Sequence, residues 1–440
     1  MRLISHSSLI VILFLTIPLQ GQTVYRLKDC IAIGLDKNFS ILIAKNSEII
    51  SKNNFTPGNA GFLPSVDLNG RHTGTFNNTT QKFTDGTQTV NDGVFNTATN
   101  GSVTLAMGIF NGFSAITTYK KLGELNQLGQ LNTQLTIENL IADIVSGYYN
   151  YILQVQLMNN LRYALTLSRE RLRIDEDRYL LGSGSKLEVL QSQVYVNSDS
   201  SNLSRKYEIV KSARISLNEM MALENLNDEF ESKDTSIIVN PDLLYEKLLE
   251  ETFTSNTNLL IASKNKTISD YDYKLIVSRS YPYLNFSGGY NSILNTYTKN
   301  TTQNMLTNGL NYGFTVGVNI FDGNNQKRSI HNAAIDRDNK DLSYREVEQG
   351  VKADLLTIYS AYSNNLRLIT LEEQNFRTAT ENLEIALERY KLGNLSGIDL
   401  REVQKSLLDA RERLISANYQ TKLAEISLQL ISGKIMEYYQ

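Results

Sequence analysis

An internal duplication constrains this chain more than any other feature of its sequence. Four stretches of the first half recur in the second half in the same order, two at an offset of 218 residues and two at an offset of 211. They are 38–46 with 256–264, Leu63-Pro64 with Tyr281-Pro282, 108–112 (GIFNG) with 319–323 (NIFDG), and 178–185 with 389–396. A repeat sets the architecture before any local detail. The 440 residues therefore form two copies of one unit rather than the two or three globular domains that length alone suggests.

Each copy is expected to contain a helix, two strands and a long helical hairpin, in that order. We expect the first repeat at residues 23–221 and the second at 244–440. The segment between them, 222–243, breaks the periodicity and predicts a linker lying as a belt around the middle of the molecule.

The predicted strands are marked by alternation of apolar and polar residues. They lie at 64–76 and 101–110 in the first repeat, and at 282–291 and 312–321 in the second. Such alternation over about ten residues, with small polar residues on one side, is typical of transmembrane barrel strands, although a half-buried soluble sheet gives the same pattern. The Asn-, Thr- and Gly-rich stretches between paired strands, 77–100 and 292–311, predict solvated loops.

Aromatic residues gather at the opposite ends of these strands, as in the girdle at a membrane interface. They are Phe110, Phe113, Tyr281, Tyr283, Tyr312 and Phe321.

The helices are predicted to be rods. Only five prolines occur, and apolar residues recur at 4-3 spacing from Val351 to Tyr390 and again from Val403 to Ile431, which favours a coiled coil. A helix from about 325 to 388 would be about 95 Å long. The hairpins are expected to turn at about 180–186 and 391–397.

Composition excludes several classes of function. A single cysteine cannot form a disulfide framework, and three histidines give neither a metal site nor a catalytic constellation. With 43 basic and 46 acidic residues, nothing points to nucleic acid. We therefore expect no enzyme activity, no catalytic, cofactor-binding or metal-ligating residues, and no cofactor.

Residues 1–22 resemble a secretory signal, with Arg2 before a short apolar run at 9–19 and a small residue at Gly21. No other apolar run approaches the ~18–20 residues of a spanning helix, so any membrane contact must be made by strands. Four strands cannot close a barrel, and an open edge in lipid leaves backbone groups unsatisfied. Several copies must combine, and a closed barrel continued by helical rods is a tube.

These residues resemble the TolC-like outer-membrane efflux proteins over essentially the whole mature chain. The resemblance rests on the repeated element order, on Pro64 and Pro282 before strands, on Ile-Phe-Asn/Asp-Gly at 109–112 and 320–323, and on the paired Arg-Tyr-x-x-Gly-x-x-Ser tips. It implies an α+β membrane protein: a homotrimer with a 12-stranded β-barrel in the Gram-negative outer membrane, continued by a 12-helix α-barrel in the periplasm.

The resemblance also implies an exit duct for efflux or type I secretion, working with a periplasmic adaptor protein and an inner-membrane transporter. The transported substrate, the class of pump and the cleavage site of the signal stay open. The alternative is a periplasmic coiled-coil adaptor or structural protein without a channel, against which the strands with aromatic ends argue.

Matching the family's tips residue by residue gives a candidate aperture. Asp399 and Glu402 stand where the family has acidic rings, and Tyr390 and Glu188 match a tyrosine and an acid that hold its gate. Leu395 stands where the family has an arginine that also holds the gate, so how the gate is latched stays open. The remaining tip residues are candidates for adaptor docking: Arg178, Tyr179, Gly182, Ser185, Arg389, Gly393 and Ser396.

A simpler reading of the tips is structural. Gly182 and Gly393 supply backbone freedom for a tight turn, and Ser185 and Ser396 cap the returning helices. Glu188 and Asp399 would then be favourable first-turn charges and nothing more.

Overall fold

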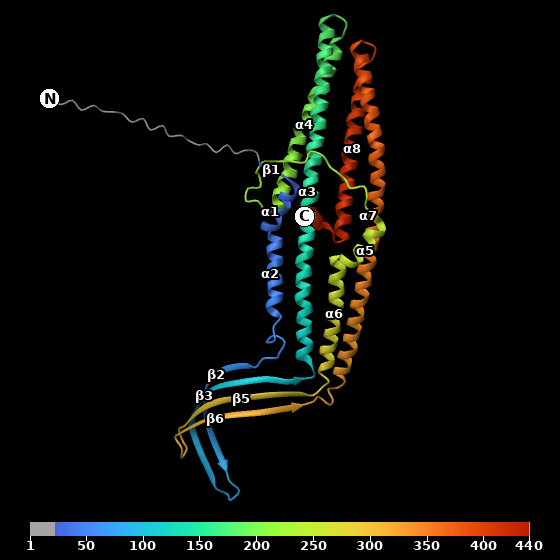
Figure 1. The fold of residues 1–440 in the computed structure, drawn as a ribbon. Helices are drawn as coiled ribbons and strands as arrows, with labels where there is room; N and C mark the ends of the chain where they lie inside the picture. Colours follow the sequence, from blue (N-terminus) through green and yellow to red (C-terminus); the bar gives the residue numbers. More distant parts are fainter. Residues whose placement is uncertain (1–22, 440) are drawn as a thin grey trace, which may run out of the picture.

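The computed structural model describes residues 23–439, so the proposed signal at 1–22 lies outside the described part. Two long helical hairpins dominate it (Figure 1). The first consists of α3 (Ser114–Leu180) and α4 (Lys186–Met220), and the second of α7 (Asn325–Lys391) and α8 (Gly397–Ile431). Corresponding helices of the two hairpins have the same length: α3 and α7 have 67 residues each, and α4 and α8 have 35 each. The duplication in the sequence is therefore also present in the helices. At 1.5 Å per residue the longer helices span about 100 Å.

Shorter helices precede the strands in both repeats. They are α1 (Leu27–Lys37) and α2 (Phe39–Asn54) in the first, and α5 (Tyr245–Ser255) and α6 (Thr257–Ser278) in the second. Asn38 and Asn256 sit between the members of each pair and cap the second helix with their side chains. A short 3₁₀ turn, η1 (Ile435–Tyr438), follows α8.

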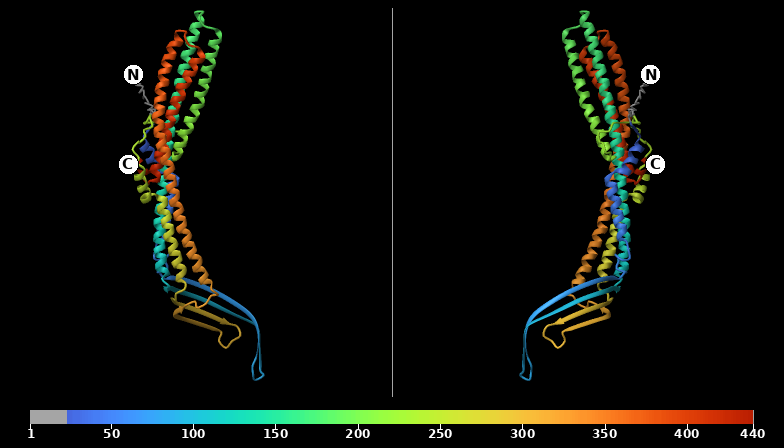
Figure 2. Two further views of the ribbon diagram at one scale, coloured as in Figure 1. Left: turned by 90° about the vertical axis from the view of Figure 1, so that its right-hand side faces the viewer. Right: turned by 90° about the vertical axis from the view of Figure 1, so that its left-hand side faces the viewer.

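Four strands form one antiparallel sheet in the order β2-β3-β5-β6. They are β2 (Ser65–Lys82), β3 (Gln88–Asn111), β5 (Tyr283–Tyr297) and β6 (Asn304–Gly317). β2 and β6 are edge strands, each paired on one side. Figure 2 shows the sheet leaving the end of the helical shaft at a bend.

The predicted loops at 77–100 and 292–311 are wrong over most of their length. β2 and β3 stay paired out to Lys82 and Gln88, and β5 and β6 out to Thr296 and Asn304. Backbone groups form the ladder whatever the polarity of the side chains, and threonine suits an exposed strand well. In the other direction, β6 ends at Gly317 rather than at 321 as predicted.

The helical shaft contains the coiled-coil seam that the spacing predicts. Along α7 the buried residues include Val351, Leu355, Tyr362, Leu383 and Tyr390. The widest core lies halfway along the molecule, where β1 (Thr23–Tyr25) pairs in parallel with β4 (Phe230–Ser232) beside α3. β4 falls inside the segment 222–243, between the end of α4 and the start of α5.

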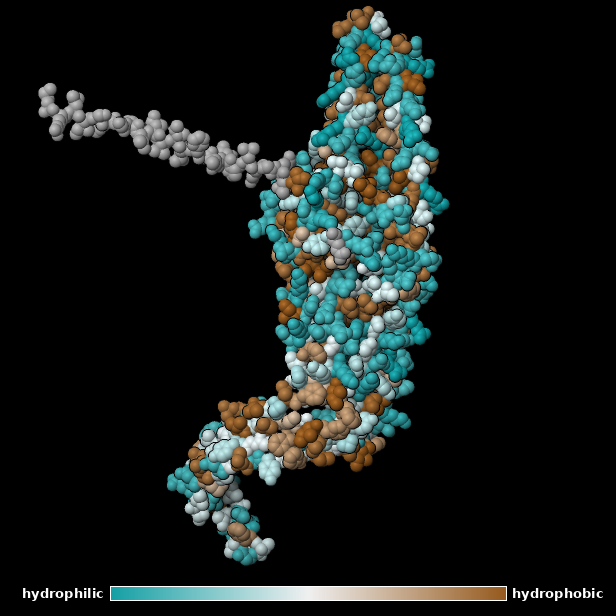
Figure 3. All heavy atoms as spheres, in the orientation of Figure 1, coloured by the Kyte–Doolittle hydropathy of each residue, from teal (hydrophilic) through white to brown (hydrophobic). Residues whose placement is uncertain are grey.

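The sheet carries exposed apolar side chains, and Figure 3 shows hydrophobic residues gathered over the sheet near its junction with the helices. On edge strand β6 the exposed apolar side chains include Leu306, Leu310, Tyr312, Phe314 and Val316. Within residues 23–439, none of the helices combines the length and the apolar character needed to cross a membrane.

Candidate functional site: the hairpin tips

Both hairpins turn in the way that the Gly and Ser positions predict. Gly182 and Gly393 have φ of +74° and +80°, the left-handed conformation that ends a helix. The Oγ of Ser185 accepts from the backbone N–H of Glu188 at 3.2 Å, and that of Ser396 accepts from the N–H of Asp399 at 3.1 Å. The predicted caps are confirmed in both repeats.

These caps decide what Glu188 can do. Its carboxylate accepts from the backbone N–H of Ser185 at 2.8 Å and completes a capping box. The same hydrogen bond from the Ser185 backbone holds the pKa of Glu188 below its usual value. Glu188 therefore caps the start of α4 within its own hairpin.

The predicted Tyr390–Glu188 hydrogen bond is wrong within the chain, because Tyr390 contacts a different acid. Tyr390 is 2% exposed, and its hydroxyl donates to Oδ1 of Asp175 on α3. Asp175 also accepts from the hydroxyl of Ser192 on α4. One carboxylate thus joins α3, α4 and α7, and the contact between the hairpins lies deeper in the bundle than predicted.

Burial strengthens this arrangement electrostatically. Burial of the phenol is the main cause that raises the pKa of Tyr390 to about 12, and the hydrogen bond to Asp175 is the second cause. The phenol therefore keeps its proton and remains a donor at neutral pH. The guanidinium of Arg178 lies over the Tyr390 ring at 4.6 Å and donates to the Tyr390 carbonyl oxygen. Arg178, predicted as a docking residue, therefore also bridges the two hairpins.

A second polar contact between the two hairpins lies further from the tips than the Tyr390–Asp175 hydrogen bond. Arg401 of α8 donates to both carboxylate oxygens of Asp199 on α4, each at 2.9 Å, and Asp199 also accepts from Ser168 of α3. The guanidinium groups of Arg401 and Arg171 both lie 4.9 Å from the centroid of the Tyr195 ring. Arg171 also approaches the Asp175 carboxylate at 3.7 Å, so the Tyr390–Asp175 and Arg401–Asp199 contacts belong to one connected network.

The sequence reasoning missed Asp175, Asp199 and Arg401. One signal was available: Ser168 and Asp175 occupy 4-3 positions of the α3 seam between Leu165 and Tyr179, where apolar residues are expected. Polar residues at such positions are buried and need partners. Nothing in the spacing of α4 or α8 marks Asp199 or Arg401 in the same way.

The other predicted tip residues lie at the surface. Asp399 and Glu402 are exposed on the first turns of α8, and the Asp399 carboxylate accepts from Ser396 Oγ at 2.7 Å. Tyr179 is 44% exposed, although Tyr390 at the matching position is buried, and Arg389 is exposed. Large apolar side chains are also exposed around both turns, which the sequence analysis did not single out: Leu180, Leu181, Leu187, Leu392 and Ile398.

Comparison with known proteins adds sequence and fold relatives. Residues 248–434 match the family model described as outer membrane efflux protein. The chain is 27% identical to outer membrane protein TolC of Vibrio cholerae serotype O1 over 206 residues, which are 44% of this chain and 44% of TolC. It is TolC-like. The matched stretch spans less than half of that curated relative.

Solved structures extend the similarity of this TolC-like chain to its whole fold. The CmeC outer membrane channel of Campylobacter jejuni has a TM-score of 0.76 at 15% identity, covering 93% of this chain and 85% of CmeC. CusC gives 0.76 at 14% identity, covering 94% and 93%. The MtrE outer membrane channel of Neisseria gonorrhoeae, solved in its open state, gives 0.68 at 15% identity, covering 94% and 91%. At these identities the likeness concerns the fold.

Proposed function

We propose that this chain is the outer-membrane exit duct of a tripartite efflux or type I secretion system, anchored in the outer membrane and reaching into the periplasm. One observation carries the proposal: a four-stranded sheet with two unpaired edges and exposed apolar residues continues directly into helical rods. An open sheet edge is not tolerated in lipid, so the sheet must close with sheets of other copies. Three copies give a 12-stranded barrel continued by a 12-helix tunnel.

The gate of this duct is proposed at the hairpin tips. The Tyr390–Asp175 and Arg401–Asp199 contacts join the first hairpin to the second, and separating the hairpins requires both to break. Asp399 and Glu402, three times each around the axis, would place like charges at the aperture and favour cations there. Glu188 contributes by fixing the start of α4.

The partners proposed are a periplasmic adaptor protein and an inner-membrane transporter that supplies the energy. The exposed apolar residues at the tips, including Leu181 and Leu392, support a docking role. Exposing a cluster of large apolar side chains to water is unfavourable, and such clusters mark protein interaction sites. Arg178, Tyr179, Gly182, Ser185, Arg389, Gly393 and Ser396 shape the same surface.

Conductance decides between this proposal and a soluble coiled-coil adaptor without a channel. The full chain, purified in detergent, should run as a trimer and insert into planar bilayers with discrete current steps. A protein that stays monomeric and soluble without detergent, and that gives no current, would contradict the proposal and favour the adaptor.

A further inference from the structure

The four-stranded sheet has one apolar face and one polar face. The register places one exposed apolar residue of each strand in a single row across the sheet: Leu68, Val103, Tyr290 and Leu310. Successive side chains of a strand point to opposite faces, so residues two positions away from this row share its face. Val66 of β2 and Phe314 of β6 do so and are exposed as well.

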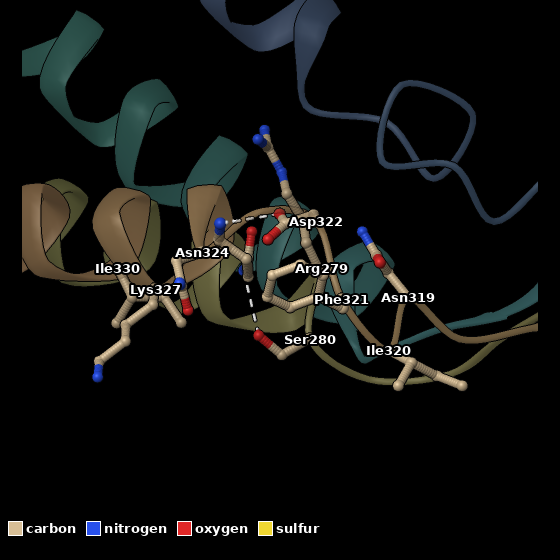
Figure 4. A pocket seen from close by; sticks show the side chains of 10 residues that line it. Arg279, Ser280, Asn319, Ile320, Phe321, Asp322, Asn324, Lys327 and Ile330 are labelled. Carbon is tan, nitrogen blue, oxygen red and sulfur yellow. Dashed lines mark hydrogen bonds between the residues drawn. The ribbon is translucent and has the colours of Figure 1, made fainter.

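The apolar face continues past the end of β6 toward the helices. Val318 and Ile320 follow Val316 at the same spacing of two residues, and all three are exposed, Ile320 to 93%. Ile320 borders a cavity of about 490 Å³ at this junction, and Figure 4 shows it pointing away from the helices. The same face is therefore apolar from the junction with the helices outward.

The charged side chains of the shared sheet lie on the opposite face. Across residues 65–77, 94–111, 283–297 and 304–317, aspartate, glutamate, lysine and arginine occur only at Asp67 and Arg71, both on β2. Each is an odd number of positions from Leu68, so each points away from the apolar row. The residues aligned with them on the other strands are uncharged: Asp67 with Thr104, Gly289 and Asn311, and Arg71 with Asn100, Ile293 and Thr307.

Neither charge is neutralised by a neighbour in the chain. Among residues 23–439, the Asp67 carboxylate and the Arg71 guanidinium form no ion pair and no side-chain hydrogen bond, and both residues are exposed. Four residues of strand, about 13 Å, separate the two, which is too far for them to pair with each other. Both charges are therefore free to act on solutes that pass along this face.

We propose that β2 supplies two rings of opposite charge to the lumen of the barrel, with Asp67 nearer the helices and Arg71 farther out. The proposal rests on the proposed duct, in which the apolar face meets lipid and the other face lines a water-filled lumen. Each copy then contributes one carboxylate at the first level and one guanidinium at the second. Rings of charged side chains select among permeating ions, so small cations are concentrated at Asp67 and small anions at Arg71.

The spacing of the rings lets each act on its own. The screening length is about 10 Å at 0.1 M salt, which is shorter than the ~13 Å between the two levels, so their opposite charges cancel only in part. At about 1 M salt the screening length falls to about 3 Å, and ions in the middle of the lumen no longer sense either ring. The selectivity of both rings should therefore depend strongly on salt.

Reversal potentials of the full-length channel in planar bilayers test the rings, because they measure the permeability ratio of K⁺ to Cl⁻. In KCl at about 0.1 M, Asp67→Asn should lower this ratio and Arg71→Gln should raise it, each about twofold. Both shifts should vanish at about 1 M. Because closed tips limit the current, each variant is recorded both alone and together with Tyr390→Phe.

Matched controls remove the same kinds of charge farther along the β2–β3 hairpin, where β5 no longer pairs with β3. They are Lys82→Gln and Asp92→Asn, and both should leave the ratio unchanged. A missing shift at Asp67 or at Arg71 in both backgrounds, shifts of the same sign, or equal shifts in the controls would overturn the rings, while a conducting wild type leaves the duct standing. A wild-type chain that gives no current contradicts the proposed function first, and the rings with it.

Discussion

Tyr390 shows how a single residue can differ from its own copy in a duplicated chain. It and Tyr179 occupy the same position of the same motif, yet Tyr390 is buried against Asp175 while Tyr179 stays at the surface beside Lys186. The duplication therefore supplies a control within the molecule. Tyr390 makes the hydrogen bond to Asp175 and Tyr179 does not, so the same substitution at the two tyrosines separates the effect of this contact from the effect of losing a hydroxyl.

Replacing Tyr390 by Phe should open the proposed gate more often. The hydrogen bond to a charged partner contributes about 1.5–3 kcal/mol, so each protomer should shift about 10- to 150-fold toward the open state. Open probability in planar bilayers measures this shift. Asp175→Asn should act in the same direction, and Tyr179→Phe should leave the channel unchanged. Equal open probabilities for Tyr390→Phe and the wild type would remove Tyr390 from the gate.

The pKa of the same phenol sets a pH dependence. Tyr390 has an ordinary pKa of 10.0, raised in the folded protein to about 12. A raised pKa means that the contribution of the group is complete below pH 10 and is lost as pH rises through 12. Open probability should therefore be insensitive to Tyr390 between pH 6 and pH 9 and increase above pH 10. The Tyr390→Phe channel should lack this alkaline step, and an identical step in both would assign it to another group.

At the scale of elements, the Arg401–Asp199 pair holds α8 against α4. Asp199→Asn would leave a largely buried guanidinium without its counter-charge, which costs about 3–5 kcal/mol in comparable buried pairs. Hydrogen exchange at the tips of α4 and α8 should accelerate strongly, while the middle of the molecule stays protected. The exposed pair Lys391–Glu388 is the control, since Glu388→Gln should change neither. Equal protection in Asp199→Asn would show that packing alone holds the hairpins.

Element positions were more predictable than the contacts between elements. The 4-3 spacing and the Gly and Ser residues of the turns locate α7 and α8 closely, because both signals are local. The spacing does not fix how one hairpin rotates about its axis relative to the other, so Tyr390 was assigned to Glu188 instead of Asp175. Strand ends were missed for another reason: pairing depends on the neighbouring strand, as the early end of β6 illustrates.

At the scale of the whole molecule, the two hairpins of the sheet have unequal reach. β3 pairs with β5 only as far as Asn96 opposite Tyr297, so beyond Asn77 the β2–β3 hairpin is a ribbon of two strands. It bends at an irregularity between Asn77 and Thr79 and projects past the rest of the sheet (Figure 1). A polar ribbon beyond the shared sheet adds nothing to closure of the barrel.

The ribbon can therefore be removed without loss of the channel. Joining Asn77 to Val94, which are paired, through an Asn-Gly turn deletes residues 78–93 and keeps the bonds between Phe95 and Thr298. Because no residue of the deleted stretch is fully buried, we expect the same oligomer mass in detergent and the same conductance as the wild type. A matched shortening inside the shared sheet, deleting the paired residues 69–70 and 101–102, should weaken the oligomer because it breaks pairing with β5. Loss of oligomer or current in the first deletion would place the ribbon in the wall of the channel and contradict this prediction.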